Sequence, residues 1–309
     1  MKHYANLHNH STHSDGVYTP AELVQVAADE GYKAIVLTDH DTVTGYEETA
    51  AACARLGLET LFGAEFSSPC DVLKENFHIT AYGFDPEYPA MRAYLDRLSA
   101  RESHQTQVLF RRGLDLGLLR DITWEEVLEY NKGITWLCNE HVFRAMKAKG
   151  LLTDLDYPRF FQTVYGPHRN EVPDLYPFCQ TPELIRLVHD AGGIALVAHP
   201  HNQLQHIGQL KQWGIDGMEV WHGDLPDAAE RREALRLAGE YDLYVSGGAD
   251  HSGLCGGAYS RYEHPEETVF WLPELSTGTT EYFFTEIRDR KKHPDRQAVI
   301  ASLLTSPDL

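Results

Sequence analysis

Histidines and carboxylates recur along this 309-residue sequence in places where they can bind metal ions. The first pair, His8 and His10, lies in the segment Asn-Leu-His-Asn-His-Ser-Thr-His-Ser-Asp-Gly. Residues two apart in an extended segment project to the same side, so both imidazoles can reach one ion. An H-x-H pair alone is weak evidence, because a histidine can equally be a hydrogen-bonded residue of a loop.

Other histidines and acidic residues lie in or after the strand-like segments of the chain. The predicted metal ligands are His8, His10, Asp15, His40, Glu65, His78, His199, Asp250 and His251. Taken singly, Asp15-Gly16 is typical of a turn and Thr38-Asp39-His40 of a helix N-cap. These separate interpretations do not explain why nearly every predicted strand end carries such a residue. Imidazole and carboxylate ligands without cysteine suit Zn²⁺, Mn²⁺ or Fe²⁺.

The elements that must position these ligands alternate between strand and helix. Before Gly83 we expect strands at Tyr4–His8, Ala34–Thr38, up to Glu65 and at Phe77–Tyr82, and helices at Thr19–Gly31 and Gly45–Leu56. After Cys179 we expect helices at Thr181–Gly192, Gln205–Trp213 and Asp227–Tyr241, and strands at Ile194–Ala198, Gly217–Val220 and Leu243–Ser246. Repeated β-then-α units predict a parallel sheet flanked by helices, closed or open, whose strand C-termini gather at one edge.

The stretch from Asp85 to Cys179 has a different pattern. We expect helices at Tyr88–Leu119 and Trp124–Gly150, and an irregular aromatic and proline-rich segment at Tyr157–Phe178. The sequence therefore predicts two parts. Residues 1–84 and 180–309 would form the metal-binding α/β domain, and residues 85–179 an inserted helical cap subdomain.

Composition limits the expected partners and location. The formal charge of −19 disfavours long nucleic acid and anionic membranes, and no stretch approaches the roughly 20 apolar residues of a membrane span. The five cysteines are scattered and never form a C-x-x-C pair, which favours a reducing compartment. No apolar run follows Lys2 to indicate a secretory signal, so we expect a cytoplasmic protein. The oligomeric state is not predicted.

Six segments resemble the PHP (polymerase and histidinol phosphatase) domain phosphoesterases, over roughly residues 3–258. They are Leu-His-Asn-His-Ser-Thr-His-Ser-Asp-Gly (7–16), Leu-Thr-Asp-His-Asp (37–41), Gly-Ala-Glu (63–65), His-Ile-Thr-Ala-Tyr-Gly (78–83), Ala-Gly-Gly-Ile-Ala-Leu-Val-Ala-His-Pro (191–200) and Gly-Gly-Ala-Asp-His-Ser-Gly (247–253). The resemblance implies an α/β fold, a distorted (β/α)₇ barrel carrying the helical cap, with two or three divalent ions (Zn, Mn or Fe) at the strand C-termini.

The resemblance also implies how the ligands divide among the ions. His8, His10, Glu65 and Asp250 would hold one ion, and Glu65, His78 and His199 a second. Asp15, His40 and His251 would hold a third. The family often ends its last motif as Asp-x-His, whereas His251 directly follows Asp250 and Ser252 takes the next position.

The cap supplies the predicted substrate-binding residues. In some stand-alone members that act on small phosphate esters, an Arg-Pro-His segment of the insertion contacts phosphate. The comparable stretch here resembles it in His141 of Asn139-Glu140-His141, but the arginine is absent. Arg144, His168 and Arg169 are the predicted substitutes.

The primary hypothesis is a metal-dependent phosphoesterase acting on a small phosphomonoester or cyclic phosphodiester of a sugar or nucleotide. A hydroxide bridging two ions would attack phosphorus. His201 would protonate the leaving group, and Asp39 is a second candidate catalytic residue. One alternative is amidohydrolase-type hydrolysis of a C–N bond or lactone, although no carbamylated-lysine position follows a strand. Another is a non-catalytic metal-binding module, which metal would stabilise without turnover.

Overall fold

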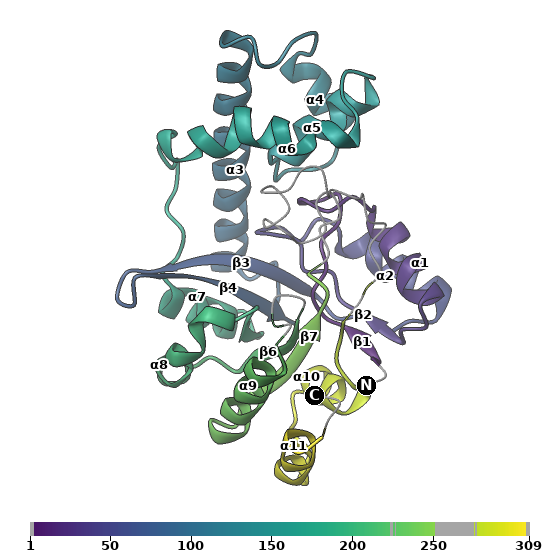
Figure 1. The fold of residues 1–309 in the computed structure, drawn as a ribbon, viewed down its shortest axis with the longest axis vertical. Helices are drawn as coiled ribbons and strands as arrows, with labels where there is room; N and C mark the ends of the chain where they lie inside the picture. The colour runs from purple at the N-terminus through teal and green to yellow at the C-terminus, as the bar shows by residue number, and fades with distance from the viewer. Residues whose placement is uncertain (1–2, 223–224, 226, 251–274, 276, 307–309) are drawn as a thin grey trace.

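Two sheets form the centre of the protein (Figure 1). The computed structural model describes the chain except residues 1–2, 223–224, 226, 251–274, 276 and 307–309. The smaller sheet pairs β1 (Ala5–Asn6) with β2 (Ala34–Ile35) in parallel. The larger has the order β3 (Gly63–Cys70), β4 (Glu75–Tyr82), β5 (Ile194–Val197), β6 (Gly217–His222) and β7 (Tyr244–Gly248).

The strands of the larger sheet do not all run the same way. β5, β6 and β7 are parallel, as the alternation with helices predicts. β3 and β4 form an antiparallel hairpin, and β4 is also antiparallel to β5, so the expectation of a parallel sheet is wrong here. The cause is the short connection at residues 71–74, because a parallel crossover needs a dozen residues or more. Lys74 completes this turn with a φ of 56°.

The described strands form two separate sheets, rather than the single closed barrel that the resemblance implies. Individual backbone contacts join them. Leu7 N–H donates to the Gly247 carbonyl at 3.1 Å, Asp250 N–H donates to the His8 carbonyl at 2.9 Å, and His40 forms an isolated bridge with Glu65. The predicted α/β class is confirmed, and these contacts bring the metal-ligand candidates together.

Helices cover the sheets on several sides (Figure 1). Their bounds are α1 Pro20–Asp29, α2 Tyr46–Leu56, α7 Thr181–Asp190, α8 Ile207–Gln212, α9 Ala228–Glu240, α10 Glu281–Asp289 and α11 Arg296–Leu304. A capping box between Thr19 and Glu22 begins α1. The main hydrophobic cluster packs the larger sheet against α7, α9 and α10. Along the described chain, no helix has both the length and the apolar character needed to cross a membrane.

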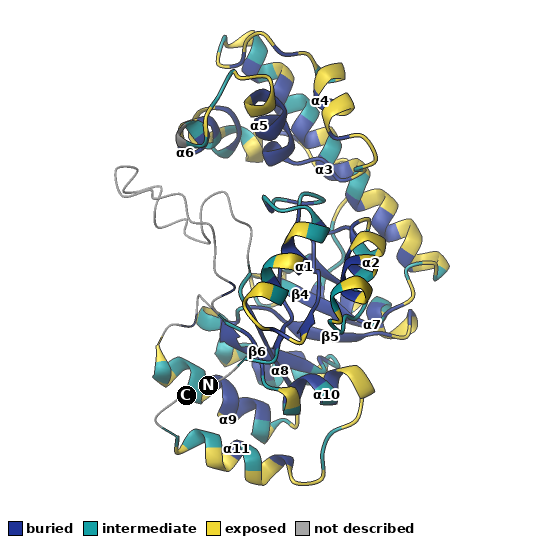
Figure 2. Ribbon diagram, turned by 90° about the vertical axis from the view of Figure 1, so that its right-hand side faces the viewer, coloured by how far each residue is buried: buried dark blue, intermediate teal, exposed yellow. Residues whose placement is uncertain are grey.

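A helical region lies between β4 and α7 in the sequence. The long helix α3 (Pro89–Asp115) extends from the sheets, and α4 (Trp124–Tyr130), α5 (Asn139–Ala148) and α6 (Tyr157–Phe160) pack along its far part (Figures 1 and 2). The expected second helix is thus divided into α4 and α5, and Gly133 lies between them with a φ of 94°. Short turns of 3-10 and π helix extend α6 to Glu171 in the segment expected to be irregular. This region has a hydrophobic cluster of its own.

Candidate metal centre

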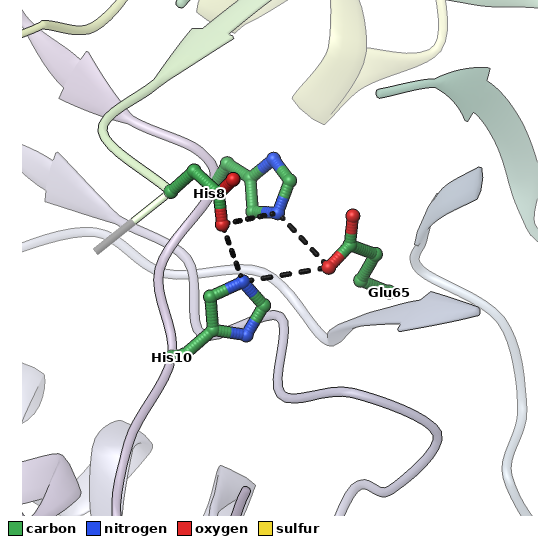
Figure 3. Close-up of side chains that lie close together, drawn as sticks. His8, His10 and Glu65 are labelled. Atoms are coloured by element: carbon green, nitrogen blue, oxygen red, sulfur yellow. Dashed lines mark hydrogen bonds and ion pairs between the residues drawn. The ribbon is translucent and has the colours of Figure 1, made fainter. Parts of the chain in front are cut away.

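The carboxylate of Glu65 is surrounded by the ring nitrogens of several histidines. It is the third residue of β3, not the end of a strand as expected, and its side chain is fully buried. Its Oε2 lies 3.2 Å from Nε2 of His8, 3.4 Å from Nε2 of His10 and 2.9 Å from Nδ1 of His40. Figure 3 shows the labelled His8, His10 and Glu65 side chains pointing toward one another. Strand β3 and the segments that follow β1 and β2 therefore present their ligand atoms to one point.

The first group of ligand atoms fits a cation. Nε2 of His8 and Oε2 of Glu65 are buried, and within the described chain neither makes a hydrogen bond. The Oδ1 of Asp250 lies 3.5 Å from Nε2 of His8 and 2.8 Å from Nε2 of His10. Ligands on a tetrahedral ion with bonds near 2.1 Å stand about 3.4 Å apart. His8, His10, Glu65 and Asp250 thus offer the donor types and nearly the spacing of a metal site.

The other oxygen of Glu65 faces two further histidines. Its Oε1 lies 3.0 Å from Nδ1 of His78, on β4, and 3.2 Å from Nε2 of His199, which follows β5. The imidazole rings of His78 and His199 are 5.1 Å apart, centroid to centroid. Glu65 can therefore place one oxygen in each of two neighbouring groups of ligands.

Asp15 lies near a third group. Its carboxylate oxygens are 3.8 Å from Nδ1 of His10 and 3.9 Å from Nε2 of His40. His10 therefore faces Glu65 with one ring nitrogen and Asp15 with the other, and His40 does the same. The predicted ligand His251 lies outside the described residues.

The charges in the centre shift the pKa values of its members strongly. Burial raises the pKa of Glu65, but the facing imidazoles of His8, His40 and His78 outweigh burial and hold it well below its usual range. Burial lowers the pKa of His8, but Glu219, Glu65 and Asp250 raise it well above its usual range. A metal ion that binds Nε2 of His8 must displace the proton that this raised pKa keeps on the ring, so the affinity for metal depends on pH.

Glu219 and His222, both on β6, belong to the centre and were not among the predicted site residues. Oε1 of Glu219 accepts a hydrogen bond of 2.9 Å from Nδ1 of His8. His222 is buried, and its Nε2 lies 3.3 Å from Oδ2 of Asp250. The sequence feature that could have indicated Glu219 is its place within the apolar strand Gly-Met-Glu-Val-Trp-His. An acidic residue is rarely buried in such a strand unless it is paired.

The two predicted catalytic residues occupy different surroundings. Asp39 is buried and accepts hydrogen bonds from the backbone N–H and hydroxyl of Ser11 and from the hydroxyl of Ser14. These contacts hold the loop that follows His10. His201 is partly exposed, and its Nδ1 donates to the carbonyl oxygen of His199 at 2.7 Å. Its ring centroid lies 6.3 Å from that of His199.

A cavity of about 290 Å³ lies between the metal centre and the helical region. Asp15, His40 and His78 line one side, and residues of the helical region line the other, among them Trp136, Glu140 and Arg169. Its volume is at the small end of the range of ~300–1,000 Å³ that is typical of ligand pockets. The centre therefore opens into a space that suits a small ligand.

His141 and Arg144, on α5, contact the loop at residues 12–16. Nδ1 of His141 accepts from the Cys138 N–H, and Nε2 donates to the Thr12 carbonyl. Burial and the neighbouring Arg144 lower the pKa of His141 well below its usual range, consistent with a neutral ring. The Arg144 guanidinium donates to the carbonyl oxygens of Thr12, Ser14 and Gly16. Both side chains thus donate hydrogen bonds to the loop that carries Asp15.

The other two predicted substrate residues lie further along the helical region. Arg169 lines the cavity, and its Nη2 lies 3.3 Å from both carboxylate oxygens of Glu102. Nδ1 of His168 lies 3.2 Å from Glu171 and away from the described cavity lining.

The sequence of this chain matches a known protein family. The family model described as "PHP domain" matches residues 6–161. The chain belongs to the PHP domain family. The resemblance seen in the sequence is thereby confirmed, and the PHP match begins at the strand that leads into His8 and extends into the helical region.

Three curated relatives of this PHP protein are enzymes with different named activities. A 5'-3' exoribonuclease of Haemophilus influenzae is 31% identical and covers 81% of this chain and 90% of its own length. A phosphoribosyl 1,2-cyclic phosphate 1,2-diphosphodiesterase of Eggerthella lenta is 29% identical over 81% of this chain and 95% of its own. A 3',5'-nucleoside bisphosphate phosphatase of Chromobacterium violaceum is 29% identical over 79% and 86%, respectively.

Solved structures have the same PHP fold. A protein of Bifidobacterium adolescentis assigned as a metal-dependent phosphoesterase superposes with a TM-score of 0.72 at 26% identity, over 94% of this chain and 97% of its own. An amidohydrolase structure from Chromobacterium violaceum reaches 0.65 at 24% identity, over 85% and 96%, and supports the fold alone. The expectation of a metal-dependent phosphoric ester hydrolase is confirmed for this PHP chain.

Proposed function

We propose that this PHP protein hydrolyses a small phosphate ester, either a phosphomonoester or a cyclic phosphodiester of a sugar or nucleotide. The observation that carries the proposal is the cavity of about 290 Å³ between the buried histidine and carboxylate cluster and the helical region. The named relatives act on different phosphate esters, so they support the class of reaction more than one substrate.

The proposed cofactor is a set of two or three divalent ions, of Zn, Mn or Fe. We assign His8, His10, Glu65 and Asp250 to the first ion and Glu65, His78 and His199 to the second. His40, whose Nδ1 also faces Glu65, and Asp15 would hold the third, together with His251. When bound, such ions lower the pKa of water and neutralise phosphoryl oxygens.

The protein's own residues supply position and proton transfer. Glu65 keeps two ligand groups adjacent, and Asp39 holds the loop after His10 through Ser11 and Ser14. His201 is our proposed proton donor to the leaving group, since its ring lies 6.3 Å from that of His199, centroid to centroid, and is partly exposed. A proton-transfer role for Asp39 stays a prediction.

The helical region is our proposed cap subdomain, at residues 85–179, on an α/β domain made of residues 1–84 and 180–309. Its separate hydrophobic cluster supports this division. The single backbone contacts between the two sheets support a distorted barrel arrangement for the α/β domain. Among the cap residues, Arg169 is the one we propose to contact substrate. Direct contacts of His141, Arg144 and His168 with substrate stay predictions.

We propose that the substrate is not long nucleic acid. The formal charge is −19, and Glu102 and Glu140 contribute acidic groups to the cavity wall. A polyanion would meet repulsion on such a surface. The expected cytoplasmic location stays a prediction.

The test is phosphate release by metal-reconstituted protein from a panel of phosphomonoesters and cyclic phosphodiesters. We expect turnover with Zn²⁺, Mn²⁺ or Fe²⁺ that chelation abolishes and that His8→Ala reduces by at least 100-fold. The exposed His104→Ala on α3 is the matched histidine control and should retain activity. Absence of turnover across the panel, in protein that binds metal, would overturn the proposal.

A further inference from the structure

Glu219 is a buried carboxylate that joins two of the proposed ion groups. It lies in β6, its side chain is fully buried, and it is not part of the cavity lining. Oε1 accepts from Nδ1 of His8 at 2.9 Å, and Oε2 accepts from the backbone N–H of His199 at 2.7 Å. One oxygen therefore serves a residue of the first group, and the other a residue of the second.

The contact with His8 determines which ring nitrogen faces the centre. A carboxylate only accepts hydrogen bonds, so Nδ1 of His8 carries the proton in this contact. In a neutral ring, Nε2 then keeps its lone pair, and Nε2 is the atom that faces Glu65 at 3.2 Å. Ligating histidines commonly donate their second ring N–H to a carboxylate, which fixes both tautomer and orientation.

The contact with His199 holds an uncommon backbone conformation. His199 has a φ of 28°, in the left-handed region that non-glycine residues rarely adopt. Its N–H donates to Glu219, and its carbonyl accepts from the N–H of His201 at 2.9 Å and from the His201 ring. Such a conformation persists where the surroundings hold it. With this backbone, Nε2 of His199 lies 3.2 Å from Glu65.

We propose that Glu219 is a positioning residue that orients the ligand atoms of two ions at once, the His8 imidazole for the first and the His199 loop for the second. It acts through these residues and does not itself ligate. The 2.9 Å distance from His8 is a hydrogen-bond length. The proposal rests on the metal-dependent function proposed above.

Glu219→Gln tests the proposal with little change of volume. Glutamine offers one acceptor oxygen and one NH₂ donor, so it can keep one of the two contacts but not both. We expect titration of chelator-treated protein with Zn²⁺ to show 10–100-fold weaker binding, the range for such partners of metal ligands. The melting temperature of the metal-free variant measures any structural damage separately.

Glu286→Gln is the matched control. Glu286 is also fully buried and also accepts two contacts, from the His293 N–H at 2.8 Å and from Arg296 at 2.9 Å, but it lies on α10 away from the centre. Its loss should lower the metal-free melting temperature and leave Zn²⁺ affinity within two-fold of wild type. Equal Zn²⁺ affinity in Glu219→Gln and wild type would overturn the proposal.

A measurement on the wild-type protein covers the case in which Glu219→Gln does not fold. In the Zn²⁺ form, long-range ¹H–¹⁵N spectra should show His8 protonated at Nδ1 and metal-bound at Nε2, assigned by comparison with His8→Asn. Coordination through Nδ1 would overturn the proposal. If wild-type protein binds no divalent metal, the proposed function fails instead, so the two failures are distinguishable.

Discussion

Arg144 of α5 donates a hydrogen bond of 2.9 Å to the carbonyl oxygen of Ser14, in the loop that carries Asp15. The same guanidinium donates to the carbonyls of Thr12 and Gly16. Three carbonyls around one cation give the loop a defined shape, because a guanidinium presents its donors in a rigid fork. The arginine that the sequence suggested for phosphate therefore makes its contacts to the backbone beside a proposed ligand.

Replacing Arg144 should damage both stability and the third group of ligands. Arg144→Met leaves three carbonyls without their charged donor, and hydrogen bonds to charged groups contribute about 1.5–3 kcal/mol. We expect a lower melting temperature and about one metal ion fewer per chain by elemental analysis.

Arg112→Met is the control for Arg144, since Arg112 pairs with Glu171 on the surface of the helical region. Surface pairs contribute about 0–1 kcal/mol, so stability should hardly change and metal content should not. An Arg144→Met protein with a full complement of ions would contradict the positioning of Asp15 by the cap.

Glu65→Gln should affect two ion groups together. The carboxylate faces His8, His10 and His40 with one oxygen and His78 and His199 with the other, and the neutral amide removes its charge from both sides. We expect activity to fall at least 100-fold and metal content to drop by more than one ion. A variant that lost one ion and kept the other at wild-type affinity would show that the groups are independent.

The metal-free protein should lose stability as pH rises. Burial lowers the pKa of His40, but Glu65 and Asp15 outweigh burial and raise it from 6.5 to about 10. The folded state therefore holds this proton more tightly, and the resulting stability is complete below about pH 6.5 and lost as pH rises through about 10. We expect the melting temperature of wild type to fall across this range, and that of His40→Gln to fall less. If the melting temperatures of wild type and His40→Gln fell equally with pH, the raised pKa of His40 would not be the cause.

Arg169→Met should raise KM more than it lowers kcat. Arg169 lines the cavity, and a charged hydrogen bond to substrate of about 1.4 kcal/mol corresponds to a ten-fold change. Arg111→Met is the arginine control, because Arg111 is exposed on α3, lies outside the described cavity lining and should leave KM unchanged. Steady-state kinetics with the best substrate of the panel measure both. An unchanged KM in Arg169→Met would remove Arg169 from substrate binding.

The sequence predicts which candidate ligands lie close together better than it predicts the strands that position them. His8, His10, Glu65 and Asp250 could be recognised as candidate ligands from residue type alone, and the fold brings them together. The direction of β4 cannot be recognised in this way, since alternating buried residues suit parallel and antiparallel pairing alike. The short connection after Cys70 is the sequence feature that indicates the hairpin. The expectation that Glu65 ends a strand depends on parallel strands throughout, and β3 instead continues to Cys70.

Residues that act through their neighbours are harder to predict. Glu219 and His222 lie in an apolar strand, and their roles depend on His8 and Asp250, more than 200 and nearly 30 residues away respectively. Arg144 is predicted to contact phosphate from its charge and its place in the helical region, but the sequence does not show that the carbonyls of Thr12, Ser14 and Gly16 are its hydrogen-bond partners. The hydrogen-bond partners of such residues depend on tertiary contacts, which cannot be predicted from residue type.

The contacts of α5 with the loop at residues 12–16 limit how this enzyme can be re-engineered. A helical region with its own hydrophobic cluster is a natural segment to exchange with that of a relative in order to change substrate preference. Here the exchanged segment would also remove His141 and Arg144 from the Thr12 carbonyl. A chimera that keeps these two positions should retain its ions, whereas one that replaces the whole cap would change selectivity and metal loading together.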